Sequence, residues 1–322
     1  MSEKACNTQH YSGIGGQAVL EGVMMKNREQ YALAIRKQDG TLTVEKGTHK
    51  GLLAGSFLTR TPFVRGIFMS LDSMMLGMKC INISAKYYEE EADEEPAAKE
   101  KDKDKETSGG GAGETLQSVL VVALSLVLAI GLFMLLPYFL SQLLSKVVEN
   151  RLVIAAAEGV SRLLIFLLYM IAISAMKDIR RLYQYHGAEH KCINCIESGK
   201  TLTVEHARES TRFHKRCGTS FVLLVVLVSI VVFFFIRVEN PLWRVLLRIL
   251  LLPVISGISY ELIRLAGRSN HPLVNLISAP GLWTQRITTK EPEDEMLEVA
   301  IASVEAVFDW KTYLKETFGV EA

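Results

Sequence analysis

Two short stretches of this chain concentrate side chains that bind transition metals or transfer protons. The first stretch holds two histidines, a glutamate and two cysteines within ten residues, and the second adds a histidine and a cysteine. These seven residues are His186, Glu189, His190, Cys192, Cys195, His214 and Cys217. Imidazole and thiolate are ligands that zinc prefers in proteins. Three histidines and three cysteines inside 32 residues therefore predict a divalent metal site, with zinc as the expected ion and iron or copper as alternatives.

One candidate arrangement is a helical pair of histidines. His186 and His190 are four residues apart, so a helix would place both on one face, where they could chelate one ion. With Glu189 they form the string His-x-x-Glu-His, which matches the inverted motif of zinc peptidases, whose glutamate is the general base. A match of five residues often arises by chance. This class of peptidase also needs a downstream carboxylate ligand, for which Glu261 is the candidate.

The second candidate arrangement is a pair of zinc knuckles, Cys192-x2-Cys195-x18-His214-x2-Cys217. Two such chelating pairs can close a tetrahedral structural site. The two patterns overlap, so one ion could take ligands from both. An open site built from the histidines, with or without Cys217, would leave a position for an activated water. A lone histidine is more often an ordinary surface or core residue, an interpretation that this cluster makes less attractive.

Long apolar segments before and after the cluster predict transmembrane helices, because a span needs about 20 apolar residues. Two of the four segments contain no charged residue, and the other two contain isolated charges. The segments are 115–145, 152–176, 219–236 and 242–262. Glu158 and Arg162 lie four residues apart in the second segment, so we expect them to form an ion pair that helps helices pack.

The positive charges of the connecting segments predict the orientation of these spans. The connection 177–218 carries nine lysines and arginines, whereas the other two connections are short and carry few. Positive loops remain on the cytoplasmic side. We therefore expect four spans in two hairpins, with both termini and the metal-binding connection in the cytoplasm. The net charge of +1 gives no reason to expect a nucleic-acid partner.

The remaining segments predict smaller elements around the spans. Residues 13–50 resemble a small β unit, with strands at 31–36 and 41–45 joined by a hairpin turn at Asp39-Gly40. Its glycine-rich start implies tight turns or a close approach of the backbone to another group, without the order of a dinucleotide fingerprint. Residues 62–88 predict a methionine-rich helix that lies at the membrane interface, packs on the spans, or is simply buried.

An acidic segment and a C-terminal helix complete the expected fold. Residues 89–114 are rich in charge and glycine, which predicts a disordered linker. Residues 293–315 show helical apolar spacing, so we expect an amphipathic helix on the cytosolic domain, after a turn at 270–272. The start of the chain has no apolar core of signal-peptide length, so we expect no cleavage, and reduced rather than disulfide-bonded cysteines, with Cys6 and Cys80 as bystanders.

The expected fold is thus mainly α-helical, a polytopic membrane protein with about four transmembrane helices, an N-terminal β-hairpin unit and a cytosolic metal-site region. Its expected regions are 1–88 (β unit and interfacial helix), 89–114 (linker), 115–176 and 219–268 (transmembrane hairpins), 177–218 (metal-binding loop) and 269–322 (C-terminal tail).

Five longer strings resemble the bacterial YqhQ-like membrane proteins. They are Gly15–Met25, Tyr185–Lys191, His214–Phe221, Glu261–Gly267 and Pro280–Arg286. That family is described as a domain of unknown function whose members carry a metal-dependent-enzyme label. The resemblance implies a multi-pass protein of the bacterial inner membrane. The family pattern does not include Cys192, so the resemblance favours His186, His190, His214 and Cys217 as ligands, with Cys195 and Cys192 as second choice.

Two functional hypotheses follow. In the first, the protein is a zinc-type membrane hydrolase in which Glu189 transfers protons while Arg264 or Arg268 holds an anionic headgroup or a peptide carboxylate near Glu261. In the second, it is a non-enzymatic scaffold or an accessory to membrane-protein insertion, with a structural metal. The expected partners are the lipid bilayer and a lipid headgroup or membrane-protein segment. Three protein ligands would favour catalysis, and four would favour the scaffold.

Overall fold

The computed structural model describes residues 10–92, 112–236, 238, 240–269 and 271–321. The chain divides into two compact units. Unit 1 comprises Met1–Asp93, Met170–Val228 and Leu251–Ala322, and unit 2 comprises Glu94–Tyr169 and Ser229–Leu250. The fold is mainly helical with an N-terminal antiparallel sheet, as the sequence predicts.

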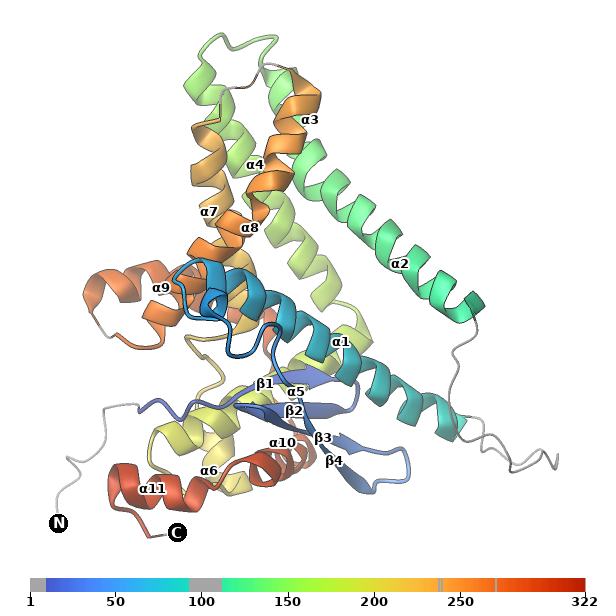
Figure 1. Ribbon diagram of the computed structural model, residues 1–322, viewed down its shortest axis with the longest axis vertical. Helices are drawn as coiled ribbons and strands as arrows, with labels where there is room; N and C mark the ends of the chain where they lie inside the picture. The colour runs from blue at the N-terminus through green and yellow to red at the C-terminus, as the bar shows by residue number, and fades with distance from the viewer. Residues whose placement is uncertain (1–9, 93–111, 237, 239, 270, 322) are drawn as a thin grey trace. The chain divides into compact units, whose positions relative to one another are not determined.

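The sheet of unit 1 has four strands in the order β1-β2-β3-β4 (Figure 1). The strands are β1 (Gly15–Val19), β2 (Gly22–Asn27), β3 (Gln30–Arg36) and β4 (Leu42–Thr48). The predicted hairpin is confirmed, because β3 pairs with β4 and Gly40 in the turn has φ +83°. The sequence did not predict β1 and β2. The glycine-rich stretch forms a hairpin of its own, with Leu20 and Glu21 as its two-residue turn.

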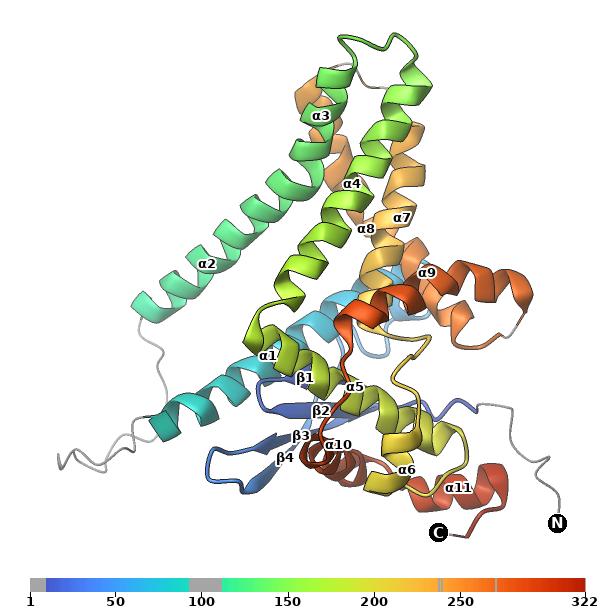
Figure 2. The ribbon, with the colours of Figure 1, turned by 180° about the vertical axis from the view of Figure 1, so that it is seen from behind.

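Helices cover both faces of this sheet (Figures 1 and 2). Successive side chains of a strand point to opposite faces. On β3, Ala32 and Ala34 belong to the core formed with α5 (Lys177–Glu197) and α10 (Asp294–Val307), whereas Leu33 belongs to the core formed with α1 (Val64–Ala92). The sheet therefore sits between α1 on one side and the pair α5 and α10 on the other.

The connection predicted as a metal-binding loop at 177–218 is largely helical. It contains α5 and the short helix α6 (Val204–Glu209), and the preceding apolar helix ends at Ser174 before α5 begins. Every residue of α5 from Gly187 to Glu197 is buried, because the sheet, α6 and α10 surround it. The candidate ligands on α5 therefore lie on a rigid helix in the centre of unit 1.

The C-terminal region contains one helix that the sequence did not predict. This helix is α9 (Pro272–Thr288), which begins directly after the expected turn, whose first residue, Asn270, lies outside the described residues. The predicted amphipathic helix at 293–315 is present as two helices, α10 and α11 (Trp310–Phe318). Its predicted packing on the domain is confirmed, since α10 contacts β2, β3 and α5.

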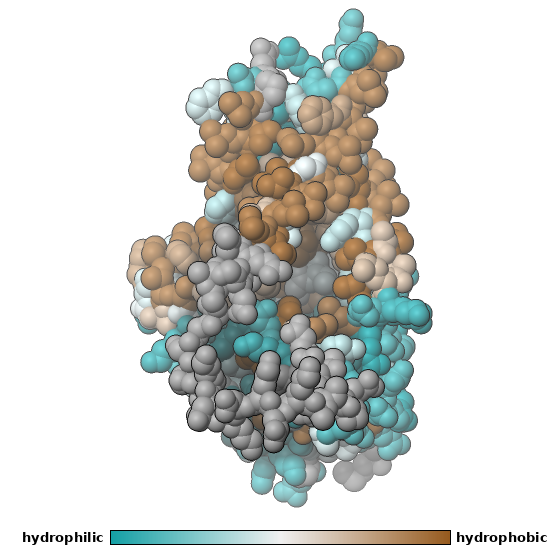
Figure 3. Space-filling view, turned by 90° about the vertical axis from the view of Figure 1, so that its right-hand side faces the viewer, coloured by the Kyte–Doolittle hydropathy of each residue, from teal (hydrophilic) through white to brown (hydrophobic). Residues whose placement is uncertain are grey.

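Three helices are long and apolar enough to cross a membrane: Ala123–Leu144, Arg151–Ser174 and Leu242–Ala266. The apolar elements are α2 (Ala112–Ile130), the π-helical turn η2 (Gly131–Leu135), α3 (Leu136–Leu144), α4 (Arg151–Ser174), α7 (Gly218–Phe234) and α8 (Pro241–Ala266). The third predicted span corresponds to α7, whose 17 residues make it a shorter apolar helix. On the face that Figure 3 shows, hydrophobic side chains cover most of the surface of the apolar helices.

The predicted linker at 89–114 is shortened by helices at both ends. Helix α1 continues to Ala92 and α2 begins at Ala112, while residues 93–111 lie outside the described part of the chain, as does Cys6. The methionine-rich helix predicted at 62–88 is α1. It buries Leu76 and Cys80 against the sheet and leaves Met74 exposed, so it is half-buried rather than enclosed.

Candidate metal centre

Three of the predicted ligands meet in unit 1. His186 and His190 lie one turn apart on α5, and Cys217 immediately precedes α7. One ligand atom from each side chain lies within 4.8 Å of the other two, and no other such triplet occurs among the described residues. His190 and Cys217 are buried, and His186 is partly exposed.

Backbone carbonyls fix the orientation of both imidazole rings. Nδ1 of His186 lies 2.9 Å from the carbonyl oxygen of Thr288, and Nδ1 of His190 lies 2.6 Å from that of Arg212. A carbonyl oxygen only accepts hydrogen bonds, so each Nδ1 carries the proton and each Nε2 is left to bind another group. Nε2 of His186 points at Sγ of Cys217, 3.3 Å away. Metal-binding histidines are typically held by this kind of N–H to carbonyl hydrogen bond.

The electrostatics favour a thiolate at Cys217. Burial acts to raise the pKa of Cys217, but His186 and His190 beside it outweigh this effect and hold the pKa well below its ordinary value. Burial likewise opposes the charged form of His186, yet the negative charge of Cys217 raises the pKa of His186 to about 9. Without a metal the two groups form a thiolate–imidazolium pair. A zinc ion fits this donor set, since it binds thiolate and neutral imidazole and releases the proton.

Glu189 lies beside the triplet, against the glycine-rich strand. Its side chain is 5% exposed, and its Oε2 is 3.5 Å from Nε2 of His190. A Cβ at Gly16 of β1 would lie 2.7 Å from Cγ of Glu189, closer than side chains tolerate. The close approach that the glycines predict is therefore made, at Gly16, to this carboxylate. A carboxylate next to Nε2 could accept a proton from a water or become a further ligand.

The segment after α9 lies along α5 and directly follows Thr288, whose carbonyl group contacts His186. Lys290 N donates to the carbonyl oxygen of Tyr183 at 2.9 Å. A Cβ at Gly187 would come within 2.0 Å of the Lys290 carbonyl oxygen. The glycine between the two histidines therefore serves packing, because no larger residue leaves room for the backbone that orients His186.

His214, the fourth favoured ligand, lies next to the triplet but outside it. Its ring centroid is 5.5 Å from that of His190. Its Nε2 lies 3.6 Å from Glu197 and 3.2 Å from Arg216. Its backbone is held by Gln285, which accepts from His214 N at 2.8 Å and donates to His214 O at 2.7 Å. In this arrangement His214 helps position the turn that carries Cys217.

The two remaining cysteines do not join the triplet. Cys192 and Cys195 are fully buried in the core that α5 shares with the sheet and α10. Burial raises the pKa of both thiols, that of Cys195 to about 11. Cys195 donates to the carbonyl oxygen of Thr201 at 3.4 Å. The structure therefore does not assemble the knuckle pattern.

The predicted anion-binding residues have other contacts. Glu261 accepts two hydrogen bonds from Arg65, at 2.7 and 2.5 Å, and this ion pair joins α1 to α8. Arg264 approaches Glu261 at 3.9 Å, and Arg268 is exposed. Within the described residues, the contacts of Glu261 therefore lead to α1 and not to the triplet.

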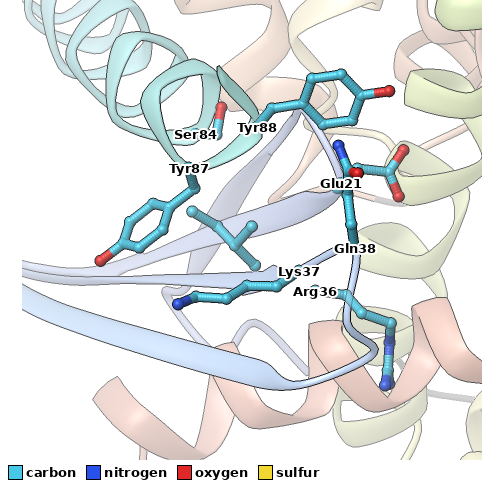
Figure 4. Close-up of a pocket in the computed structure, with 8 residues that line it drawn as sticks. Glu21, Arg36, Lys37, Gln38, Ser84, Tyr87 and Tyr88 are labelled. Atoms are coloured by element: carbon cyan, nitrogen blue, oxygen red, sulfur yellow. The ribbon is translucent and has the colours of Figure 1, made fainter. Parts of the chain in front are cut away.

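The pocket drawn in Figure 4 offers no room for a substrate. It is lined by residues of α1, the end of β3, the β3–β4 turn and the β1–β2 turn, among them Tyr87, Arg36 and Glu21. Its volume is about 10 Å³. That is roughly the space of one water molecule.

The sequence did not predict a role in the metal centre for four residues: Gly187, Glu197, Gln285 and Thr288. Gln285 lies inside the string Pro280–Arg286, which resembled the family but suggested no chemistry, and Thr288 follows it closely. No sequence pattern around Glu197 indicates its role. It accepts from Arg216 at 2.6 Å and from the Ser12 backbone at 2.9 Å, both distant in sequence.

Replacing Glu197 with glutamine is expected to lower stability by about 3 kcal/mol at pH 7. Burial acts to raise the pKa of this carboxylate, but His214 and Arg216 lower it to about 2. A lowered pKa means that the stabilisation is present above the ordinary pKa of glutamate and is lost as the pH falls toward 2. Thermal unfolding of chelator-treated protein between pH 7 and 3 measures it. The variant should show a flatter acid dependence, and an unchanged curve would contradict the assignment.

Comparisons with known proteins identify a family but no activity. Residues 61–310 match the family model described as "Protein of unknown function (DUF1385)". The chain is 36% identical over 291 residues to the "Uncharacterized protein YqhQ" of Bacillus subtilis (strain 168), covering 90% of each protein. No solved structure matches the chain. With a family model that covers most of its length, the chain belongs to the DUF1385 family, of which YqhQ of Bacillus subtilis is a relative.

Proposed function

We propose that this protein is a zinc-dependent enzyme, a hydrolase, that works at the cytoplasmic face of the bacterial inner membrane. The observation that carries the proposal is the convergence of His186, His190 and Cys217 within 4.8 Å, with both Nδ1 atoms already engaged. Three protein donors leave the fourth position of a tetrahedral zinc ion open, which is typical of catalytic sites.

The membrane location is part of the proposal. The three candidate spans and the shorter helix α7 would make two hairpins, with both termini in the cytoplasm. The nine positive charges of residues 177–218 support this orientation. A cysteine introduced at Lys200 should then react with an impermeant maleimide only after the cells are opened, and labelling of intact cells would overturn the orientation.

The residues of the site would have distinct roles in the reaction. A bound zinc ion would supply Lewis-acid chemistry. Glu189, 3.5 Å from Nε2 of His190, would take a proton from the attacking water and return it to the leaving group. The carbonyl groups of Thr288 and Arg212 would keep both rings in the tautomer that presents Nε2.

The second candidate function is a membrane scaffold or insertion accessory with a structural zinc ion. It is favoured by the same position of Glu189, because a carboxylate this close to the triplet could become the fourth ligand and close the site. The ligand count separates the two functions.

Metal analysis with the Glu189→Gln variant tests the proposal. We expect purified protein to hold about one equivalent of zinc, and X-ray absorption should report two imidazoles, one sulfur and one oxygen from solvent. Glu189→Gln should keep the zinc and the melting temperature, yet fail to complement a strain that lacks the gene. If Glu189→Gln loses zinc, the carboxylate is a ligand and the scaffold is favoured. Absence of stoichiometric metal under reducing, chelator-free conditions would refute both functions.

A further inference from the structure

Unit 2 contains a second cluster of charged side chains, placed among its apolar helices. The predicted pair is present: Arg162 donates to Oε1 of Glu158 at 2.9 Å on α4. The sequence did not predict the third member, Arg248 of α8, whose Nη1 lies 2.6 Å from the same oxygen. The three side chains are buried, with side-chain exposures of 10% for Glu158, 5% for Arg162 and 4% for Arg248.

Other groups of unit 2 satisfy part of this cluster. Nε of Arg162 donates to the carbonyl oxygen of Phe133 at 3.1 Å. Phe133 lies in the π-helical turn η2, and π turns within α-helices occur frequently at functional sites. Both guanidinium groups lie near the ring of Phe233, at 4.9 and 5.0 Å from its centroid, where the ring face attracts positive charge.

The charges of the cluster do not balance. Two guanidinium groups share one carboxylate, and arginine cannot lose its proton in a protein. Nε of Arg248 is buried and has no hydrogen-bond partner among the described residues. An uncompensated buried charge costs several kcal/mol, and this cost is greatest in an apolar setting. The cluster therefore has a net positive charge and an unpaired N–H donor, and one more negative group could satisfy both.

We propose that Arg248, Arg162 and Glu158 form an anion-binding site that takes one oxyanion, a phosphate group. The guanidinium N–H groups that Glu158 leaves unused match the paired oxygens of a phosphate. The phosphate could belong to the headgroup of an anionic lipid or arrive as a free ion from water. This site is separate from the metal centre and does not depend on its proposed function.

The rival interpretation is a helix-packing cluster that is complete in itself. The two interpretations predict different effects of Glu158→Gln on the response to phosphate. If the cluster only packs helices, Glu158→Gln removes a stabilising partner and leaves the protein indifferent to phosphate. If the cluster binds an anion, Glu158→Gln removes a competing negative charge, so phosphate should bind more tightly.

The test uses the full chain, treated with chelator so that the metal centre cannot bind phosphate. The melting temperature is measured in detergent against inorganic phosphate, with sodium chloride of equal ionic strength as reference, and in nanodiscs with or without phosphatidylglycerol. We expect phosphate or phosphatidylglycerol to raise the melting temperature of the wild type. Glu158→Gln should lower the midpoint concentration at least about tenfold. A response to phosphate alone assigns the water-borne source, and a response to phosphatidylglycerol assigns the lipid.

Two arginine variants on α8 complete the test. Arg248→Met should abolish the response. Arg244→Met is the matched control, because Arg244 lies one turn away and contacts Val238 O and the ring of Tyr138 instead. It should keep the response. The proposal is overturned if neither ligand stabilises the wild type or Glu158→Gln, or if Arg248→Met responds like the wild type. Should Arg248→Met fail to fold, the comparison of wild type with Glu158→Gln decides alone.

Discussion

Cys217→Ser is expected to weaken zinc binding at least about a hundredfold. Structural zinc sites bind with about 10–16 kcal/mol over four ligands, so one ligand is worth roughly 3 kcal/mol. Cys217 contributes the only sulfur of the triplet, and a serine hydroxyl does not ionise near neutral pH. Competition with a chromogenic zinc chelator measures the affinity, and cobalt substitution should show the loss of the charge-transfer band that a thiolate ligand produces.

Cys195→Ser is the matched control for this experiment. Cys195 is as deeply buried as Cys217 but belongs to the core, and its thiol donates to Thr201 O, a contact that a serine can keep. The control should hold zinc as the wild type does. The triplet would be wrong as a metal centre if Cys217→Ser kept wild-type affinity, and the knuckle arrangement would return if Cys195→Ser lost it.

Helix geometry explains why the sequence offered two patterns and the structure assembles one. On a helix each residue turns the side chain by about 100°. His186 and His190 are therefore about 40° apart, whereas Cys192 points about 160° away from His190, to the opposite side. Once α5 is known to be one continuous helix from Lys177 to Glu197, the two patterns exclude each other. The sequence did not reveal that continuity, because α5 is polar in composition yet completely buried from Gly187 to Glu197.

The parts of the fold with strong local periodicity were predictable. The β3–β4 hairpin carries its turn signal at Asp39-Gly40, and α4 and α8 are long apolar runs. Strands β1 and β2 were missed because glycine disfavours strands on its own. Here Gly16 is required by the approach of Glu189, a contact with a residue far along the chain.

The groups that orient the metal centre could not be predicted from the sequence, because they too act through contacts with residues far along the chain. Thr288 and Gln285 come from α9, which the sequence did not predict as a helix, and they act by backbone and amide hydrogen bonds. Such groups have no ligand signature of their own. Only their contacts in the folded protein, together with those of the segment after α9, show what they do.

Gly187→Ala is expected to destabilise the protein by about 3 kcal/mol and to lower its melting temperature by at least about 5 °C. Alanine normally stabilises a helix relative to glycine by up to about 1 kcal/mol. Here its Cβ would lie 2.0 Å from the carbonyl oxygen of Lys290, and backbone cannot rotate away as a side chain would. The displaced segment directly follows Thr288, the last residue of α9, so the variant should also bind zinc more weakly.

Gly218→Ala separates this steric effect from a general effect of replacing glycine near the centre. Gly218 begins α7 directly after Cys217, and a Cβ there would meet nothing within 4 Å. The control should change the melting temperature by no more than about 2 °C and keep wild-type zinc affinity. If Gly187→Ala is as stable as this control, the segment after α9 does not lie against α5 as described. If Gly187→Ala is destabilised but keeps full zinc affinity, the Thr288 carbonyl is not what holds His186 in its binding orientation.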